Sequence, residues 1–286
     1  MKPALSLDQQ VDLMTGRGLE VVDREMATRT LFNSSYYRLS GYARQFQVSP
    51  RSATGQTFEP GTTFETVVAA HDHDEQLSAL LLDALCVIER SLRARFAYHL
   101  AHQHGNQAFY LDPASYLAVT PHLSSFLDKL EGELSRARRP TVARYAVADD
   151  YSAVPVWVAL EVFSFGSMSK ILEYLVDDRA ARAVAASYSV PWGGFTSTVH
   201  SLAVLRNTCA HHGQLWHRRL DVQTPVQRKT RRHEPAFDSQ GPYAAVIAIK
   251  RFLLAIDPAD QRAARVRDFF ESGSPFVSGF LSPAPR

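Results

Sequence analysis

The feature that most constrains this chain is a long stretch of helical periodicity between His71 and Gly105. Apolar side chains recur there at intervals of three and four residues, the spacing that places one apolar stripe along a helix. The stripe consists of Leu77, Leu81, Ala84, Leu85, Ile88, Leu92 and Phe96. The pattern predicts a long amphipathic helix that begins with the acid-rich HDHDE of residues 71–75, since acidic side chains favour that end, and stops near Gly105.

Further segments have the same period. Helices are predicted after Pro121, after Pro155 and over residues 195–213, and one or two more over 21–47 and a last one over 241–257. The segment after Pro155 is apolar nearly all round, which predicts one central helix with Gly166 at a bend or a close contact. Residues 47–64 read as a polar loop able to carry a short hairpin, and residues 272–286 as a frayed tail. The fold class expected is all-α, a helical bundle.

Composition limits the class of protein further. The chain has 286 residues, of which 45% are hydrophobic and 21% are charged, values ordinary for a soluble globular protein. The first residues lack the apolar run of a signal peptide, and no stretch reaches the roughly 18 apolar residues of a membrane span. Two cysteines, Cys86 and Cys209, cannot form a disulfide framework or a cysteine-rich zinc site. We therefore expect a cytoplasmic protein that does not enter a membrane.

Positive charge is concentrated in one segment, although the net charge is only +2. Residues 218–232 contain one acid, Asp221, and the basic residues Arg218, Arg219, Arg228, Lys229, Arg231 and Arg232. A local patch of this kind can bind phosphates without a strongly basic chain.

The segment LRNTCAHHGQLWHRRL, residues 205–220, is the strongest candidate site. In a continuous helix Asn207 and His211 face the same way, so the amide could orient the imidazole. The helix macrodipole favours a protonated histidine at this end, which applies to His211 and to His212. An arginine that grips phosphate, here Arg206, and a histidine that exchanges protons are the groups needed to cleave RNA without a metal.

The spacing of Arg206 and His211 is weak evidence when it is taken alone. Similar arginine-to-histidine spacings, of five to seven residues, occur at Arg93 with His99, Arg95 with His102 and Arg228 with His233. In a purely structural alternative, Arg206 caps a helix end and His211 satisfies a buried carbonyl. Spacing alone supports this alternative about as well as a catalytic site.

Other clusters are poorer candidates. The side chains of HDHDE point apart at i and i+2, so a solvated helix start is favoured over a metal site. A zinc site built from His200, His211, His212 and His217 lacks a carboxylate or cysteine partner at a recognisable spacing. Glu89 and Arg93 form an expected i,i+4 pair, and a buried Glu89 could also meet Arg206 across the bundle. The tyrosines at 36, 37 and 42 are expected in the core or at an interface.

Four motifs carry a resemblance to a known family. SSYYRLSGYARQF, HDHDEQLSALLLDALCVIERSLRARFAYHL, PVWVALEVFSFGSMSKILEYL and LRNTCAHHGQLWHRRL occur in this order over roughly residues 25–222. In order and separation they resemble the bacterial Abi family of abortive-infection proteins, of the AbiD and AbiF type, whose members resemble HEPN domains. The resemblance implies a single Abi-like domain over 1–286: an N-terminal helical segment at 1–60, a HEPN-like helical core at 65–222, and a basic loop with a C-terminal helix at 223–286.

The resemblance also implies a function. HEPN domains often act as metal-independent ribonucleases, and their motif falls here on Arg206, Asn207 and His211, with His212 directly after it. Arg206 would stabilise charge on the phosphorane and His211 would transfer a proton during attack of a 2′-hydroxyl. The second proton-transfer group would come from a symmetric dimer or from His212. Residues 218–232 would hold the RNA backbone, and Trp216 would stack on a base.

Several alternatives stay open at this point. No cofactor or metal is expected, and RNA is the expected partner, as substrate and also as a regulatory small RNA. The rival class is a non-catalytic helical module that binds RNA or a protein, because one fold hosts active and inactive members. A ribonuclease held inactive until a phage product or a bound RNA changes the dimer is a second alternative.

Overall fold

The computed structural model describes residues 4–50, 56–105, 108–137, 140–148 and 150–283. These residues form α-helices joined by short 3-10 turns and loops, and no β-strand occurs among them. The helices are α1 Leu7–Thr15, α2 Arg24–Ser34, α3 Tyr36–Ala43, α4 Phe64–His104, α5 Leu123–Arg136, α6 Pro140–Ala143, α7 Val156–Ala159, α8 Phe165–Tyr174, α9 Arg179–Ser187, α10 Phe195–Ala210, α11 Arg228–Arg231, α12 Pro242–Ile256, α13 Gln261–Phe270 and α14 Val277–Leu281. The predicted all-α helical bundle is confirmed.

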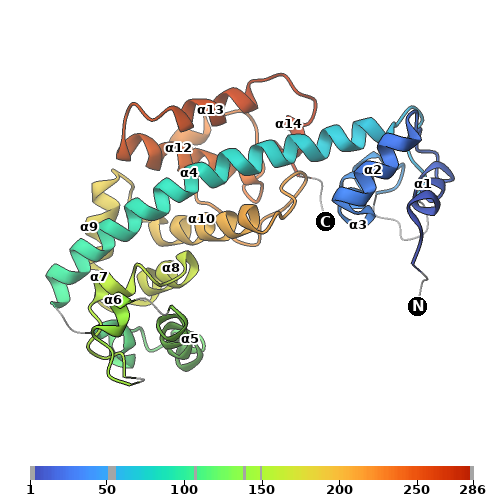
Figure 1. Ribbon diagram of the computed structural model, residues 1–286. Coiled ribbons are helices and arrows are strands. Elements are labelled where there is room, and N and C mark those ends of the chain that lie inside the picture. Colours follow the sequence, from blue (N-terminus) through green and yellow to red (C-terminus); the bar gives the residue numbers. More distant parts are fainter. Residues whose placement is uncertain (1–3, 51–55, 106–107, 138–139, 149, 284–286) are drawn as a thin grey trace.

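Helix α4 runs the whole length of the molecule (Figure 1). Its 41 residues correspond to about 60 Å at 1.5 Å per residue. The Thr63 side chain caps its start by accepting a hydrogen bond from the Thr66 N–H at 3.1 Å, and Gly105 ends it with a left-handed φ of 65°. All seven members of the predicted apolar stripe are buried. The helix nevertheless begins at Phe64, so HDHDE lies inside it and not at its start.

Three groups of helices pack along α4. Helices α1, α2 and α3 lie at its N-terminal end, and α5 to α9 lie around its C-terminal end (Figure 1). Between them α10, α12 and α13 pack directly on α4, and α10 also packs on α8. The buried apolar side chains of all three groups belong to one core cluster that extends from Val11 to Phe280.

Residues 154–175 form two helices, so the prediction of one continuous helix there is wrong. The chain leaves α7 after Ala159, and α8 starts again with Ser164 as its N-cap. The Ser164 hydroxyl accepts a hydrogen bond from the Ser167 N–H at 3.1 Å, and the backbone N–H of Ser164 donates to Glu133 of α5 at 2.8 Å. A polar cap held by a neighbouring helix stabilises a new helix start, and Gly166 falls in its first turn.

The predicted frayed tail is also wrong for the residues that the structure describes. Helix α14 packs against the core, with Phe280 fully buried. At Gly279 an added Cβ would stand 2.3 Å from the indole nitrogen of Trp216, so the close contact requires glycine. In the loop before α4, Gln47 and Phe58 form one antiparallel bridge. The rest of the suggested hairpin, at 51–55, and the tail residues 284–286 lie outside the described part of the chain.

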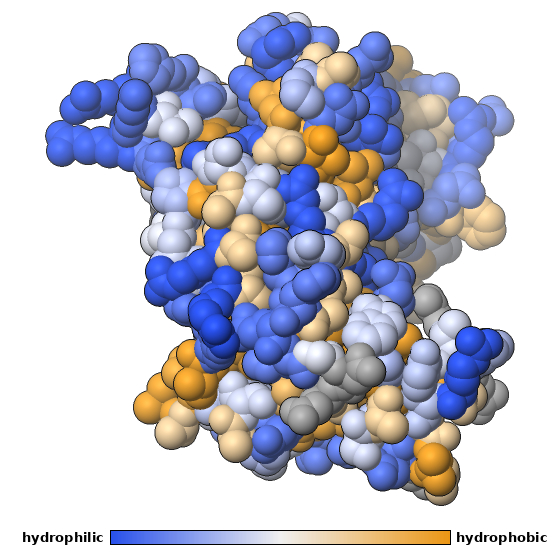
Figure 2. All heavy atoms as spheres, turned by 90° about the vertical axis from the view of Figure 1, so that its left-hand side faces the viewer, coloured by the Kyte–Doolittle hydropathy of each residue, from blue (hydrophilic) through white to orange (hydrophobic). Residues whose placement is uncertain are grey.

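The surface is mixed in character. Figure 2 views the end of the molecule at which α9 and the C-terminal part of α4 lie, and there hydrophilic side chains separate several patches of apolar ones. Within the described residues, no helix combines the length and the apolar character needed to cross a bilayer.

Candidate functional site

The candidate segment leaves α10 through a Schellman turn. The His212 N–H donates to the Cys209 carbonyl at 3.1 Å and the Gly213 N–H to the Thr208 carbonyl at 2.7 Å, the two bonds of that motif. The left-handed position is occupied by His212, with φ 54°, and not by Gly213, which follows it. The helix therefore ends at Ala210, and the imidazoles of His211 and His212 are both exposed.

Arg206 is positioned by a buried carboxylate on α4. Its Nε lies 3.1 Å from Oε2 of Glu89, and because this nitrogen makes no hydrogen bond the contact is an ion pair. The other oxygen of Glu89 accepts from Nη2 of Arg93 at 2.5 Å. Arg93 also donates to the Leu160 carbonyl at the end of α7. One glutamate, 8% exposed, thus holds two guanidinium groups, as the sequence suggested for both.

The side chain of Asn207 contacts Arg206 in this structure. Its Oδ1 accepts a hydrogen bond from Nη1 of Arg206 at 3.2 Å. Among the described residues no side-chain hydrogen bond joins Asn207 to His211, which are connected only by the backbone bond from the His211 N–H to the Asn207 carbonyl at 3.0 Å. The expected orientation of the imidazole by the amide is not formed here, and the ring of His211 remains open to solvent.

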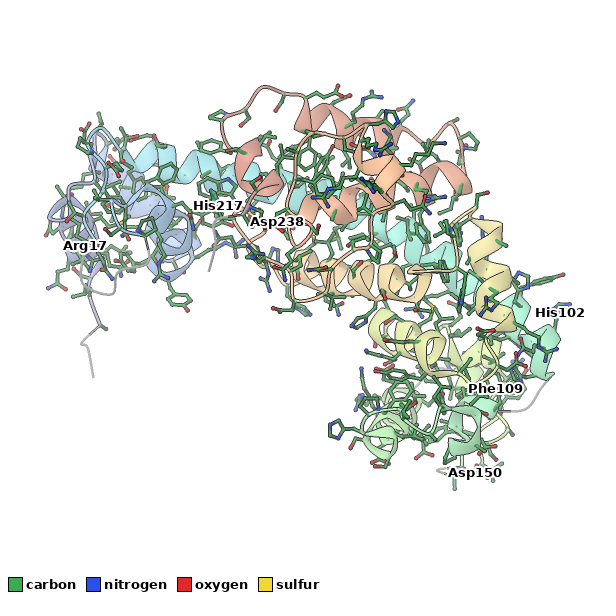
Figure 3. The ribbon with its side chains drawn as sticks, turned by 180° about the vertical axis from the view of Figure 1, so that it is seen from behind. Arg17, His102, Phe109, Asp150, His217 and Asp238 are labelled. Atoms are coloured by element: carbon green, nitrogen blue, oxygen red, sulfur yellow. The ribbon has the colours of Figure 1, made fainter. Side chains whose placement is uncertain are left out.

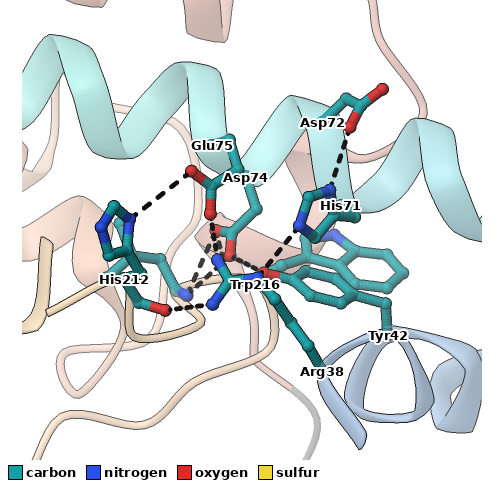
Figure 4. Close-up of polar contacts among 9 residues, drawn as sticks. Arg38, Tyr42, His71, Asp72, Asp74, Glu75, His212 and Trp216 are labelled. Atoms are coloured by element: carbon teal, nitrogen blue, oxygen red, sulfur yellow. Dashed lines mark hydrogen bonds and ion pairs between the residues drawn. The ribbon is translucent and has the colours of Figure 1, made fainter. Parts of the chain in front are cut away.

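Asp74 of α4 fixes the chain that follows the histidines (Figure 4). Its carboxylate accepts from the backbone N–H groups of Leu215 and Trp216 at 3.0–3.2 Å, and from the Tyr42 hydroxyl at 2.6 Å. Burial raises the pKa of this carboxyl above its ordinary value, while the three hydrogen bonds act in the opposite direction. A buried acid with three donors thus ties α3, α4 and the 215–216 loop together.

A second polar group joins α3 to the histidine turn (Figure 4). Arg38 donates to the backbone carbonyl of His212 at 2.7 Å and to Nε2 of His71 at 3.1 Å, and it forms an ion pair with Glu75. The other oxygen of Glu75 lies 3.9 Å from Nδ1 of His212. This group holds His212 beside α4, with 74% of its side chain exposed.

Trp216 packs into the molecule. Only 5% of it is exposed, and its indole N–H donates to the Phe276 carbonyl at 2.9 Å. Its ring lies against Tyr42, Phe46 and Phe276. In this structure the indole therefore contributes to the core, and a base could stack on it only after it moved.

The predicted basic residues divide into two sets. Arg219 pairs with Asp238 at 3.1 Å and Arg231 donates to the Phe237 carbonyl at 2.5 Å, so both hold the loop before α12. The backbone N–H groups of Asp238 and His217 bind the carbonyls of Leu281 and Gly279, so both residues lie beside α14 (Figure 3). The second set is Arg218, which is half-buried, and the exposed Arg228, Lys229 and Arg232.

The remaining sequence candidates have structural partners. The view of HDHDE as a solvated helix start is wrong, because Asp74 is buried and the ring of His73 stacks on Phe269 at 4.3 Å. His200 contacts the Ser169 hydroxyl at 3.2 Å. The part of the chain that the structure describes contains no group of three or more histidine, cysteine, aspartate or glutamate residues able to hold a metal. Burial raises the pKa of the Cys209 thiol to about 11, so this thiol stays protonated.

Two members of the site were missed at the level of sequence. Arg38 and Glu75 were assigned no role, although they connect α3 to the histidine turn. A signal for the arginine was its place within the SSYYRLSGYARQF motif, one turn from the tyrosine whose hydroxyl binds Asp74. A signal for the acid was its position directly beside an aspartate that lies on the apolar stripe.

The family model described as Abi-like protein matches residues 29–217, about two thirds of the chain, and the match includes Arg38, Asp74, Glu89 and the segment 206–212. Neither a curated protein nor a solved structure matches the chain.

Proposed function

The chain belongs to the Abi-like protein family, and from this premise we propose that it is a metal-independent endoribonuclease that acts in abortive infection. Membership in the family supports a role in this form of defence against phage. The observation that carries the enzymatic proposal is the end of α10, where Arg206, anchored by a buried acid, is followed by an exposed His211.

The geometry suits an arginine that binds phosphate. The ion pair with Glu89 fixes one side of the Arg206 guanidinium, while a third of the side chain remains exposed. A guanidinium restrained on one side loses less rotamer freedom when its open side binds a phosphodiester. Arg206 would then stabilise the charge that develops on the phosphorane oxygens.

Histidine supplies the proton transfers. A base takes the proton from the 2′-hydroxyl, whose oxygen attacks the adjacent phosphorus, and an acid protonates the departing 5′-oxygen. The products are a 2′,3′-cyclic phosphate and a 5′-hydroxyl. His211 takes one of these roles. The other falls to His212 of the same chain or to His211 of a second copy in a symmetric dimer.

The test is incubation of the purified protein with transfer RNA in EDTA. Wild type should cleave and leave cyclic phosphate ends, and His211→Ala should lose cleavage while it keeps the helical circular dichroism of wild type. His233→Ala is the matched control, because His233 is exposed and lies outside the α10 segment. Cleavage that persists in His211→Ala, or that requires a divalent metal, would contradict the proposal.

A non-catalytic RNA-binding or protein-binding module is the second candidate. It is favoured by the Glu89 contact, because an arginine neutralised within its own chain is also what a structural role requires. This candidate predicts that wild type and His211→Ala both leave RNA intact and bind it equally well.

A further inference from the structure

A cleft of about 560 Å³ opens between α3 and residues 214–218, directly after the histidine turn. Its volume is in the range of small-ligand sites. It is lined by eleven residues, none of which is acidic: Tyr37, Arg38, Ser40, Gly41, Tyr42, Arg44, Gln45, Gln214, Trp216, His217 and Arg218. Three arginines and no carboxylate in one concave surface, in a chain of net charge +2, favour a ligand with negative charge.

Two of the three arginines are available to bind a negatively charged ligand. Arg38 is used internally, since Glu75, His71 and the His212 carbonyl engage its guanidinium. Within the described residues, no side-chain hydrogen bond or ion pair engages Arg44 or Arg218. These two come from opposite walls of the cleft, one from the end of α3 and the other from the loop, so a chain of phosphates in the cleft could contact both.

The cleft also presents an open aromatic ring. Tyr37, in the first turn of α3, is 89% exposed, whereas Tyr42 is 1% exposed and belongs to the core. The expectation that the tyrosines of this motif lie in the core or at an interface is confirmed for Tyr42, while for the exposed Tyr37 an interface position stays a prediction. An exposed ring beside unpaired arginines is the combination with which proteins bind single-stranded nucleic acid, because any unpaired base can stack on it.

The cleft adjoins the candidate catalytic turn. Arg38 lines the cleft and binds the backbone of His212, and Gln214 on the opposite wall follows that residue by two positions. A strand held in the cleft would therefore continue toward the end of α10. Serine and glutamine side chains on the walls offer hydrogen bonds to base edges and to 2′-hydroxyl groups.

We propose that this cleft binds a single-stranded segment of RNA, with phosphates on Arg44 and Arg218 and one base stacked on Tyr37, and that it presents this strand to Arg206 and His211. The choice of RNA as the ligand rests on the proposed function. It places the strand between α3 and the 214–218 loop, at residues other than the basic residues 228–232.

The test measures binding separately from cleavage. The probe is a fluorescent 2′-O-methyl RNA of about 12 nucleotides, a length near the footprint of single-strand-binding domains, which cannot undergo 2′-hydroxyl attack. Fluorescence anisotropy of the full chain in EDTA gives the affinity at several salt concentrations. We expect Tyr37→Ala to weaken binding about tenfold through the lost base stack. Arg44→Ala and Arg218→Ala should each reduce the slope of log K against log salt by about 0.7, one phosphate contact on a single strand.

Matched controls lie at the other end of α4. Arg144→Ala and Tyr98→Ala change an exposed arginine and an exposed tyrosine there and should leave the affinity unchanged. Wild-type affinity in all three cleft variants would overturn the proposal, as would binding that responds only to changes at Arg228 or Arg232. Equal affinity for the duplex form of the probe, or binding of a glutamate-rich peptide in place of RNA, would overturn it as well.

The two proposals can fail separately. Binding of the probe through the cleft, together with intact transfer RNA, would refute the nuclease and keep the cleft assignment. Cleavage of transfer RNA that is lost in His211→Ala and unchanged in the three cleft variants would keep the nuclease and refute the cleft assignment.

Discussion

Replacing Glu89 with glutamine should destabilise the protein more than the loss of any surface carboxylate. Glu89 is 8% exposed and contacts two cations, Arg93 with 14% of its side chain exposed and Arg206 with 33%. Breaking a fully buried ion pair costs about 3–5 kcal/mol, because the remaining charge stays buried without a partner. Water reaches part of both arginines here, so we expect a loss of about 2–4 kcal/mol in the free energy of unfolding.

The assay is equilibrium unfolding in urea followed by far-ultraviolet circular dichroism. Asp178→Asn is the control, because Asp178 forms an i,i+4 pair with Arg182 in which both side chains are more than a third exposed. That change should cost less than about 1 kcal/mol. In an Arg206→Met background the cost of Glu89→Gln should fall, since one of the two unpaired cations is then absent. A Glu89→Gln loss no larger than that of Asp178→Asn would refute the reasoning.

Three further predictions follow from individual contacts. His212→Gly should raise the free energy of unfolding by about 0.5–1 kcal/mol, because glycine adopts the left-handed φ at this helix end without strain; a loss in urea unfolding would contradict this. Gly279→Ala should cost about 1–3 kcal/mol, since the new methyl group meets the Trp216 indole, and an unchanged melting temperature would show that α14 is not docked. Burial lowers the pKa of His73, so the unfolded chain takes up the proton first and stability should fall as the pH drops below about 6.5. His73→Phe should flatten this dependence in melts between pH 7 and about 5.5, and an equal slope in both proteins would rule out His73 as its source.

The helices that could be predicted from the sequence were those with a single apolar stripe. Residues 77–96 and 195–209 satisfy the helical period over several turns, and burial of those positions follows from the period itself. The break between α7 and α8 could not be predicted in this way. Residues 156–174 are apolar nearly all round, so periodicity does not locate the cap, which depends on the contact between Ser164 and Glu133 of another helix.

The tail shows a second limit of local patterns. Residues 277–281 form too short a segment to establish a helical period, and serine, glycine and proline around them are typical of loops. Their order comes from tertiary contacts, above all the burial of Phe280 and the fit of Gly279 under Trp216. Composition alone therefore predicted a frayed end where the fold has a docked helix.

The candidate site shows what a buried acid signals within an apolar stripe. Ala70, Asp74, Leu77 and Leu81 follow one another at intervals of four, three and four, so the register of α4 places Asp74 on its buried face. Glu89 shares that face beside Ile88. A carboxylate at such a position is costly unless it has partners, so its presence predicts donors from another part of the chain. Asp74 finds them in α3 and in the loop after α10.

The partners of both acids lead to the same place. Glu89 holds Arg206 one turn before the end of α10, and Asp74 holds the backbone of Leu215 and Trp216 just after it. The exposed histidines lie between these two anchors, so α4 fixes the segment on both sides while it leaves the imidazoles open to solvent. Two buried acids thus fix the backbone on both sides of residues 207–214, and the proposed proton transfers by His211 or His212 to and from a bound phosphodiester would require such fixed geometry.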